Sequence, residues 1–213
     1  MATSDGNSMY KNIRGKVGDV VSYPLFDQMV HRVVGERKSK FSENELAHHD
    51  AMKPLNYFLA TIISFCRAGF ELEAKGTRCN AYNMAVKANF HTVKGKYKDQ
   101  YIEYSEVLVS KGKMPVVKEA SVKTTEEGLD FSWSSEFNRV NRFANDQTML
   151  LVYFPEKGYY IYELAGEKRL KGAESLLVPE SLRKMQAHVY ISFISSDRKS
   201  ISDSLYLGEM SWN

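Results

Sequence analysis

The chain has 213 residues, of which 43% are hydrophobic and 26% are charged, and its formal net charge is +3. This composition excludes an intrinsically disordered chain, and the length allows one large domain or two modest ones. Residues 1–12 are polar and no run of 18 apolar residues occurs, so the sequence predicts neither a signal peptide nor a membrane-spanning segment. Two cysteines, Cys66 and Cys79, fit a reducing compartment without a disulfide framework. We therefore expect the protein in the cytoplasm or within a virion or other particle.

The first predicted element is a β-hairpin with strands at 17–23 and 29–34. It follows Gly15-Lys16-Val17-Gly18, whose glycine spacing differs from that of a Walker loop and which precedes a strand instead of a helix. We interpret Gly15 and Gly18 as turn and bulge glycines. Because an isolated hairpin is only marginally stable, either the following helices or another subunit must cover it.

A helix is predicted to begin near Glu43, because Ser42 and Glu45 have the spacing of a capping box. We expect Pro54 to kink this helix or to begin a second one, and Gly69 to end the helical segment. Between these two residues an apolar stripe occurs at helical spacing. It consists of Leu55, Phe58, Leu59, Ile62, Ile63 and Cys66.

Three further features complete the first part of the chain. A short helix is expected across 79–89, and alternation of side chains predicts a strand over 101–109. The Lys-Gly-Lys sequence at 111–113 then indicates a boundary, which divides the chain into an N-terminal part, 1–113, and a C-terminal part, 114–213.

The C-terminal part has the rhythm of seven short strands separated by turns. They are expected at 116–123, 129–134, 148–154, 159–163, 174–178, 188–194 and 201–207. Seven short strands in about 100 residues are typical of an immunoglobulin-like β-sandwich, and the missing cysteine pair favours the fibronectin type III variety. The placing of Leu177 and Pro179 before Tyr190 resembles the sequence pattern of a tyrosine corner. The predicted class is α+β: an N-terminal β-hairpin plus helices, followed by this immunoglobulin/fibronectin-III-like sandwich.

The sequence offers little support for catalysis. Glu45 and His48 share one helix face, but a helical metal site of this kind needs a second copy and further carboxylates. Cys66 lies on an apolar helix face, and Asp130 and Asp146 lie near strand ends, where carboxylates usually bind turn amides. We therefore predict no catalytic residue, no metal, no cofactor and no enzyme activity.

The strongest candidate for ligand binding is a basic and aromatic segment across 91–104. Cations in such a segment contact phosphates and aromatic rings stack on bases, so nucleic acid is the ligand it would take. The candidate residues are Lys94, Lys96, Tyr97, Lys98 and Tyr101. The alternative interpretation is an exposed basic loop that enters an aromatic strand.

Self-association is the second kind of interaction that the sequence suggests. The N-terminal segment, the hairpin and an apolar pair after the last strand are the candidates for contact with other subunits of an assembly. The candidate interface residues are Tyr10, Val20, Val30, Val34, Met210 and Trp212. For the last two, packing against their own chain is an equal alternative.

Several short motifs occur in a characteristic order along the chain. They are Gly15-Lys16-Val17-Gly18, Tyr104-Ser105-Glu106-Val107-Leu108 with Lys111-Gly112, Phe131-Ser132-Trp133, Asn145-Asp146, and the stretch Ser202-Asp203-Ser204-Leu205-Tyr206-Leu207-Gly208. In this order the chain resembles a family of uncharacterised bacterial proteins, a domain of unknown function, over almost its whole length. The resemblance implies no activity.

Three functional hypotheses follow. The first is a non-enzymatic structural protein, a subunit of a larger homo- or hetero-oligomeric particle, of which a phage virion or neck component is the most concrete version by fold analogy. The second is a nucleic-acid-binding accessory protein that uses residues 91–104. The third is an adhesin or carbohydrate-binding module that works through the loops of the sandwich.

Overall fold

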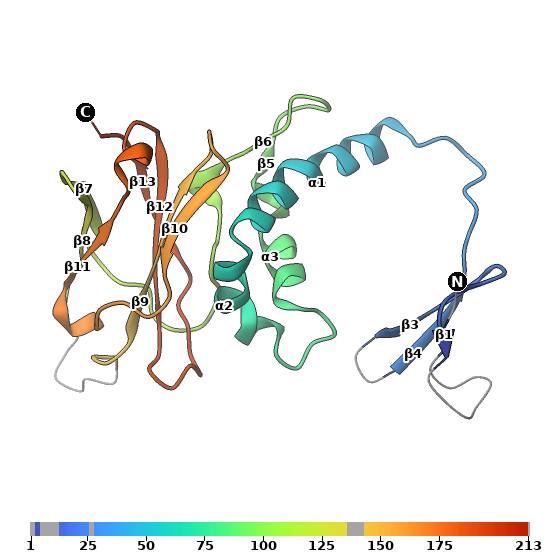
Figure 1. Ribbon diagram of the computed structural model, residues 1–213, viewed down its shortest axis with the longest axis horizontal. Coiled ribbons are helices and arrows are strands. Elements are labelled where there is room, and N and C mark those ends of the chain that lie inside the picture. The colour runs from blue at the N-terminus through green and yellow to red at the C-terminus, as the bar shows by residue number, and fades with distance from the viewer. Residues whose placement is uncertain (1–2, 5–12, 26–27, 136–142, 213) are drawn as a thin grey trace. The chain divides into compact units, whose positions relative to one another are not determined.

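The computed structural model describes residues 3–4, 13–25, 28–135 and 143–212 (Figure 1). It contains both helices and antiparallel sheets, which confirms the predicted α+β class. The chain forms two compact units, residues 1–43 and 44–213. The boundary predicted at residue 113 therefore falls inside the second unit.

The N-terminal unit is a four-stranded antiparallel sheet with the strand order β1-β2-β3-β4. The strands are β1 (Thr3–Ser4), β2 (Ile13–Val17), β3 (Val20–Leu25) and β4 (Gln28–Val33). Gly18 and Asp19 form a two-residue turn between β2 and β3, and the φ of 55° at Gly18 favours glycine there. The turn role of Gly18 is confirmed, whereas the sheet has two more strands than the predicted hairpin.

Helices begin the second unit. They are α1 (Glu43–Thr61), α2 (Ile63–Ala74) and α3 (Ala81–Asn89). The start at Glu43 agrees with the prediction, but α1 continues through Pro54 and breaks only at Ile62. Gly69 as a helix end was wrong, because α2 continues past it. Gly69 instead allows close approach of another segment, since a Cβ there would overlap the carbonyl oxygen of Val109.

Residues 101–109, in the segment between α3 and β7 (Ser121–Thr124), were predicted as one strand, and this was wrong. The segment contains β5 (Val93–Lys94), β6 (Tyr101–Ile102) and a 3₁₀ turn at Tyr104–Glu106. The buried Asn89 side chain binds both backbone groups of Leu108: its amide donates to the carbonyl oxygen at 2.7 Å, and its oxygen accepts from the N–H at 2.8 Å. These bonds replace strand pairing, so alternating side chains here do not mark a strand.

Seven strands follow and form two antiparallel sheets. The three-stranded sheet has the order β11-β8-β7 and the four-stranded sheet the order β10-β9-β12-β13. The strands are β7 (Ser121–Thr124), β8 (Gly128–Ser132), β9 (Gln147–Phe154), β10 (Tyr159–Glu163), β11 (Ala173–Leu177), β12 (Ala187–Ile194) and β13 (Leu205–Met210).

The four-stranded sheet is the middle of three layers in this unit (Figure 1). On one face, Met149, Leu151 and Tyr153 belong to the same core as helix residues such as Phe58 of α1 and Phe65 of α2. The opposite face packs against the three-stranded sheet through a second core, which includes Leu150, Val152, Phe154, Val189, Ile191, Phe193, Leu129, Phe131 and Trp133. Strands β9 and β12 are therefore buried on both faces, which explains the unbroken apolar run in β9.

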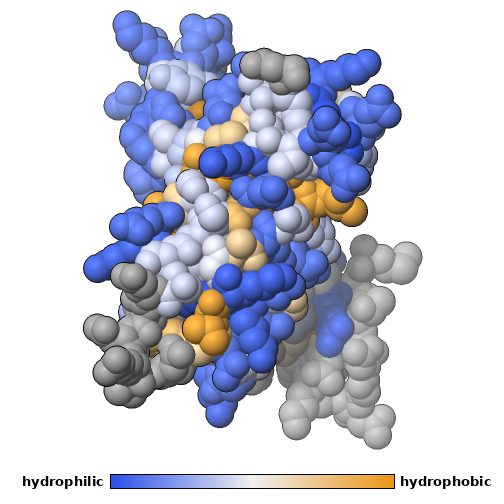
Figure 2. Space-filling view, turned by 90° about the vertical axis from the view of Figure 1, so that its left-hand side faces the viewer, coloured by the Kyte–Doolittle hydropathy of each residue, from blue (hydrophilic) through white to orange (hydrophobic). Residues whose placement is uncertain are grey.

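The three-stranded sheet turns its other face to solvent, and Figure 2 shows that face as mostly hydrophilic. Ser121 and Ser132 share a hydrogen bond of 2.8 Å there, and Ser175 donates to Asp130 at 2.6 Å. The predicted tyrosine corner was wrong, because the hydroxyl of Tyr190 donates to the carbonyl oxygen of Tyr104 and not to a residue shortly before it in the chain. Tyr190 thus links the middle sheet to the segment between α3 and β7.

Candidate interaction surfaces

The basic and aromatic segment forms a hairpin whose loop lies on α1. Strands β5 and β6 pair, and the loop between them bonds to the helix at two points. The N–H of Lys98 donates to Asp50 Oδ2 at 3.1 Å, and the amide of Gln100 donates to the carbonyl oxygen of Ala47 at 3.2 Å. All five residues predicted to bind nucleic acid lie in this hairpin, where the rings of Tyr97 and Tyr101 are 39% and 56% exposed.

Carboxylates already neutralise part of the positive charge on this hairpin. Lys94 Nζ lies 2.8 Å from Glu106, and Lys53 Nζ lies 2.8 Å from Asp50 beside the loop. The hydrogen bond from Lys53 holds the pKa of Asp50 below its usual value, and the same bond raises the pKa of Lys53. The pairing of Lys94 with Glu106 weakens the attraction that the hairpin can exert on phosphates.

The sheet of the N-terminal unit has two chemically different faces, which follow from its strand register. We call the first the valine face. It carries Ile13, Gly15, Val17, Val20, Ser22, Pro24, Met29, His31 and Val33. Val20 is directly opposite both Val17 and Val33, and these three side chains are 38%, 57% and 67% exposed. Ser22 Oγ lies 2.7 Å from His31 Nδ1 in the centre of the face.

We call the second face of this sheet the cationic face. It carries Arg14, Lys16, Val21, Tyr23, Leu25, Gln28, Val30 and Arg32. Lys16 and Arg32 are opposite Val21 from the two sides of β3, and the Arg32 guanidinium lies 6.0 Å from the centre of the Tyr23 ring. The described residues of β1 to β4 include no acidic side chain.

The predicted interface residues do not form one surface. Val20 is on the valine face, Val30 is on the cationic face, and Val34 follows the end of β4. Tyr10 lies outside the described residues. Sequence reasoning missed the cationic face, although strict alternation from the Gly18 turn could have revealed it.

Met210 and Trp212 pack against their own chain. Both contact the core between the two sheets. The indole N–H of Trp212 donates to the carbonyl oxygen of Gly128 at 3.1 Å, and its ring stacks near Phe154 with centroids 6.3 Å apart. Met210 and Trp212 thus cover part of the core between the two sheets.

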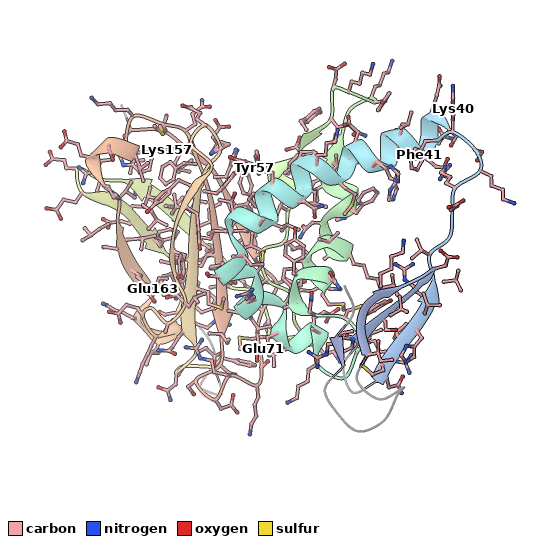
Figure 3. The ribbon with its side chains drawn as sticks, turned by 45° about the vertical axis from the view of Figure 1, so that its right-hand side comes forward. Lys40, Phe41, Tyr57, Glu71, Lys157 and Glu163 are labelled. Carbon is pink, nitrogen blue, oxygen red and sulfur yellow. The ribbon has the colours of Figure 1, made fainter. Side chains whose placement is uncertain are left out.

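Tyrosine and histidine side chains gather between the helices and the middle sheet. The ring of His188 stacks on Tyr104 at 4.1 Å, and its Nδ1 lies 2.9 Å from the hydroxyl of Tyr206. Burial lowers the pKa of His188 and raises those of Tyr104 and Tyr206. Tyr57 extends from α1 toward the sheets, where its hydroxyl meets the turn at Gly158 (Figure 3). This cluster joins the layers of the unit.

Groups with catalytic potential are dispersed or held in turns. Burial raises the pKa of the Cys66 thiol to about 12, which keeps it protonated. A pocket of about 490 Å³ includes Asp146 and Asp197 in its lining. Asp197 accepts hydrogen bonds from Ser195 Oγ and the N–H of Lys199, and the bond from Ser195 lowers its pKa. These bonds fix a tight turn.

The described part of the chain lacks clusters of metal ligands and membrane-spanning helices. Within it, no group of three or more His, Cys, Asp or Glu side chains could hold a metal ion. No helix there has both the length and the apolar character needed to cross a membrane.

Comparison with known proteins gives one result. Neither the curated proteins nor the solved structures include a significant match to this chain. The model of one family, described as "Family of unknown function (DUF6266)", matches residues 13–208, from β2 into β13. The match spans nearly the whole chain and confirms its resemblance to a domain of unknown function. The protein therefore belongs to the family of unknown function DUF6266.

Proposed function

We propose that this protein is a non-enzymatic assembly subunit that binds a second copy of itself through the valine face. The observation that carries the proposal is the exposed row of Val17, Val20 and Val33. The described part of the N-terminal unit contains no helix before Glu43, so it offers no helix of its own to cover this row. Removing such apolar area from water stabilises association by roughly 25 cal/mol per Å² before the entropic costs of binding.

Charge favours a second copy as the occupant of the valine face. The described residues of this face include no Lys, Arg, Asp or Glu, so two copies can stack without bringing these like charges together. The opposite face holds Arg14, Lys16 and Arg32, and stacking two copies through it would place like charges together. The valine face is thus the self-complementary one, as a two-fold interface requires.

The strand orders support a structural role for the second unit. Numbered from β7, strands 1, 2 and 5 form one sheet and strands 3, 4, 6 and 7 form the other. This distribution favours a fibronectin type III-like sandwich, an architecture common in binding and structural proteins. A virion or neck component remains the most concrete version of the proposal, by fold analogy alone.

The test is the mass of the native particle by light scattering after gel filtration. Unaltered protein is expected as a dimer or a larger defined oligomer, and the double variant Val20→Lys, Val33→Lys as a single chain. Leu177→Lys is the matched control, because Leu177 is as exposed as Val33, at 67%, but lies in β11 of the second unit. A monomeric unaltered protein, or equal masses for all three proteins, would exclude self-association through this face.

Nucleic-acid binding through the β5–β6 hairpin is the second candidate function. The favourable observation is the exposure of Tyr97 and Tyr101 beside Lys96 and Lys98. The variant Lys94→Glu, Lys96→Glu, Lys98→Glu should then lose affinity for an oligonucleotide. Retention of full affinity in this variant would exclude the hairpin as the binding site.

A further inference from the structure

We propose that the cationic face of the N-terminal sheet binds single-stranded nucleic acid. Arg14, Lys16 and Arg32 would contact phosphates, while Tyr23 would stack beneath a base. This site is separate from both the valine face and the β5–β6 hairpin, so it goes beyond the function proposed above.

The strand register places cations on both sides of an aromatic centre. Arg14 and Lys16 are two residues apart on β2, Tyr23 is on the central strand β3, and Arg32 is on β4. Neighbouring strands lie about 4.8 Å apart, so the cations on β2 and β4 are separated by roughly 10 Å across the face. A nucleic-acid strand that crosses β3 would thus meet positive charge before and after the ring.

Within the described residues of their own sheet, no carboxylate neutralises these cations. The described residues nearest in sequence that carry a carboxylate are Asp19, in the turn, and Glu36, beyond β4. In the β5–β6 hairpin, by contrast, the ammonium of Lys94 is already bound to Glu106. Counterion release by phosphate binding is therefore more favourable at the cationic face.

The aromatic centre favours single strands over duplexes. The Tyr23 ring and the Arg32 guanidinium can both stack on a base whose face is free, and bases in a duplex are stacked on one another. A broad sheet face also cannot enter a groove as a helix or a two-stranded ribbon does. Val21 and Val30 in the centre of this face are half-buried, whereas Leu25 at the end of β3 is 44% exposed, so lipid vesicles are included in the experiment as a competing surface.

The experiment is fluorescence anisotropy of a labelled 12-residue oligothymidylate with the full chain, between 50 and 200 mM NaCl. The logarithm of the binding constant should fall against the logarithm of the salt concentration with a slope of about −2, because three cations each contribute about −0.7 on a single strand. Arg14→Glu, Lys16→Glu, Arg32→Glu should abolish binding. Tyr23→Ala should weaken it by about 5- to 100-fold, whereas Tyr23→Phe should retain it.

Two comparisons make the result decisive. The hairpin variant Lys94→Glu, Lys96→Glu, Lys98→Glu should bind like the unaltered protein, and a loss of affinity confined to it would overturn the proposal. Duplex DNA, heparin and vesicles containing phosphatidylserine should bind more weakly than the single strand. Equal binding to these polyanions with no effect of Tyr23→Ala would overturn the single-strand assignment, as would no binding at 50 mM NaCl.

Discussion

The described residues of the protein form two antiparallel sheets of four strands, and the two sheets differ in what covers them. In the second unit, β9 and β12 are buried on both faces, by helices on one side and by a second sheet on the other. In the N-terminal unit, successive side chains along each strand point to opposite faces, so one face carries exposed valines and the other carries exposed cations. The comparison shows that the same secondary structure can build a core in one place and present exposed apolar and cationic faces in another.

The first way to test this comparison is to truncate one apolar side chain in each unit. Phe58 is fully buried, and its ring meets Tyr153 and Tyr104 edge-on at 4.8 and 5.6 Å. Phe58→Ala should lower the free energy of unfolding by about 3–5 kcal/mol, because it leaves a cavity. Val33→Ala should change it by less than about 0.5 kcal/mol, because the side chain is already in water.

Urea unfolding followed by far-ultraviolet circular dichroism measures both variants of this pair. If Val33→Ala at low protein concentration were as destabilising as Phe58→Ala, the valine face would be part of a core and not an exposed surface.

The second way compares two glycines. Gly69→Ala places a methyl group against the carbonyl oxygen of Val109, and the N–H of Lys111 also donates to the carbonyl oxygen of Gly69 at 3.0 Å. The overlap should cost about 1–3 kcal/mol, more than the roughly 0.5–1 kcal/mol that alanine contributes in a helix. Gly35 has open space around it, so Gly35→Ala is the control.

Unfolding followed by tryptophan fluorescence is the measurement for Gly69, since Trp133 and Trp212 both lie in the second unit. If the Gly69→Ala protein were as stable as the unaltered one, α2 and the backbone at Val109 could move apart without a loss of folding free energy.

Much of the fold could be predicted from local patterns. The capping residues around Ser42 marked the start of α1, and turn glycines and prolines separated seven strands. The errors arose where distant residues decide the structure. Gly69 reads as a helix end until the Val109 backbone is placed beside it, and the alternation at 101–109 reads as a strand until the Asn89 side chain binds Leu108.

The candidate surfaces were less predictable, because they depend on register. Val20 and Val30 look equivalent in the sequence, yet pairing across β3 and β4 places them on opposite faces. Arg14 and Arg32 are 18 positions apart along the printed sequence and share a face only through the Gly18 turn. The carboxylate partner of Lys94, which is Glu106, likewise depends on how the hairpin folds.

The smallest expected effect is on the pH dependence of stability, and it is tested by comparing two histidines. Each of them is hydrogen-bonded to a hydroxyl group on a four-stranded sheet. His188 stacks on Tyr104 and contacts the hydroxyl of Tyr206, and burial lowers its pKa despite the opposing influence of Glu209 and Glu103. Below about pH 6.5 the unfolded chain therefore binds a proton that the folded chain resists, so stability should fall as the pH decreases from 7.5 to 5. The measurement is urea unfolding by tryptophan fluorescence across this range.

The variant His188→Gln isolates this contribution, because glutamine keeps polar atoms near Tyr206 but does not titrate there. The stability advantage of the unaltered protein over this variant should shrink as the pH falls, since only the unaltered protein carries the cost of keeping a buried imidazole neutral. His31→Gln is the control, because His31 lies in the N-terminal unit, which contains no tryptophan. Parallel stability curves for the unaltered protein and His188→Gln would show that a charged imidazole is tolerated in this cluster as readily as in water. The face of the middle sheet that the helices cover would then be more accessible to water than its buried strands indicate.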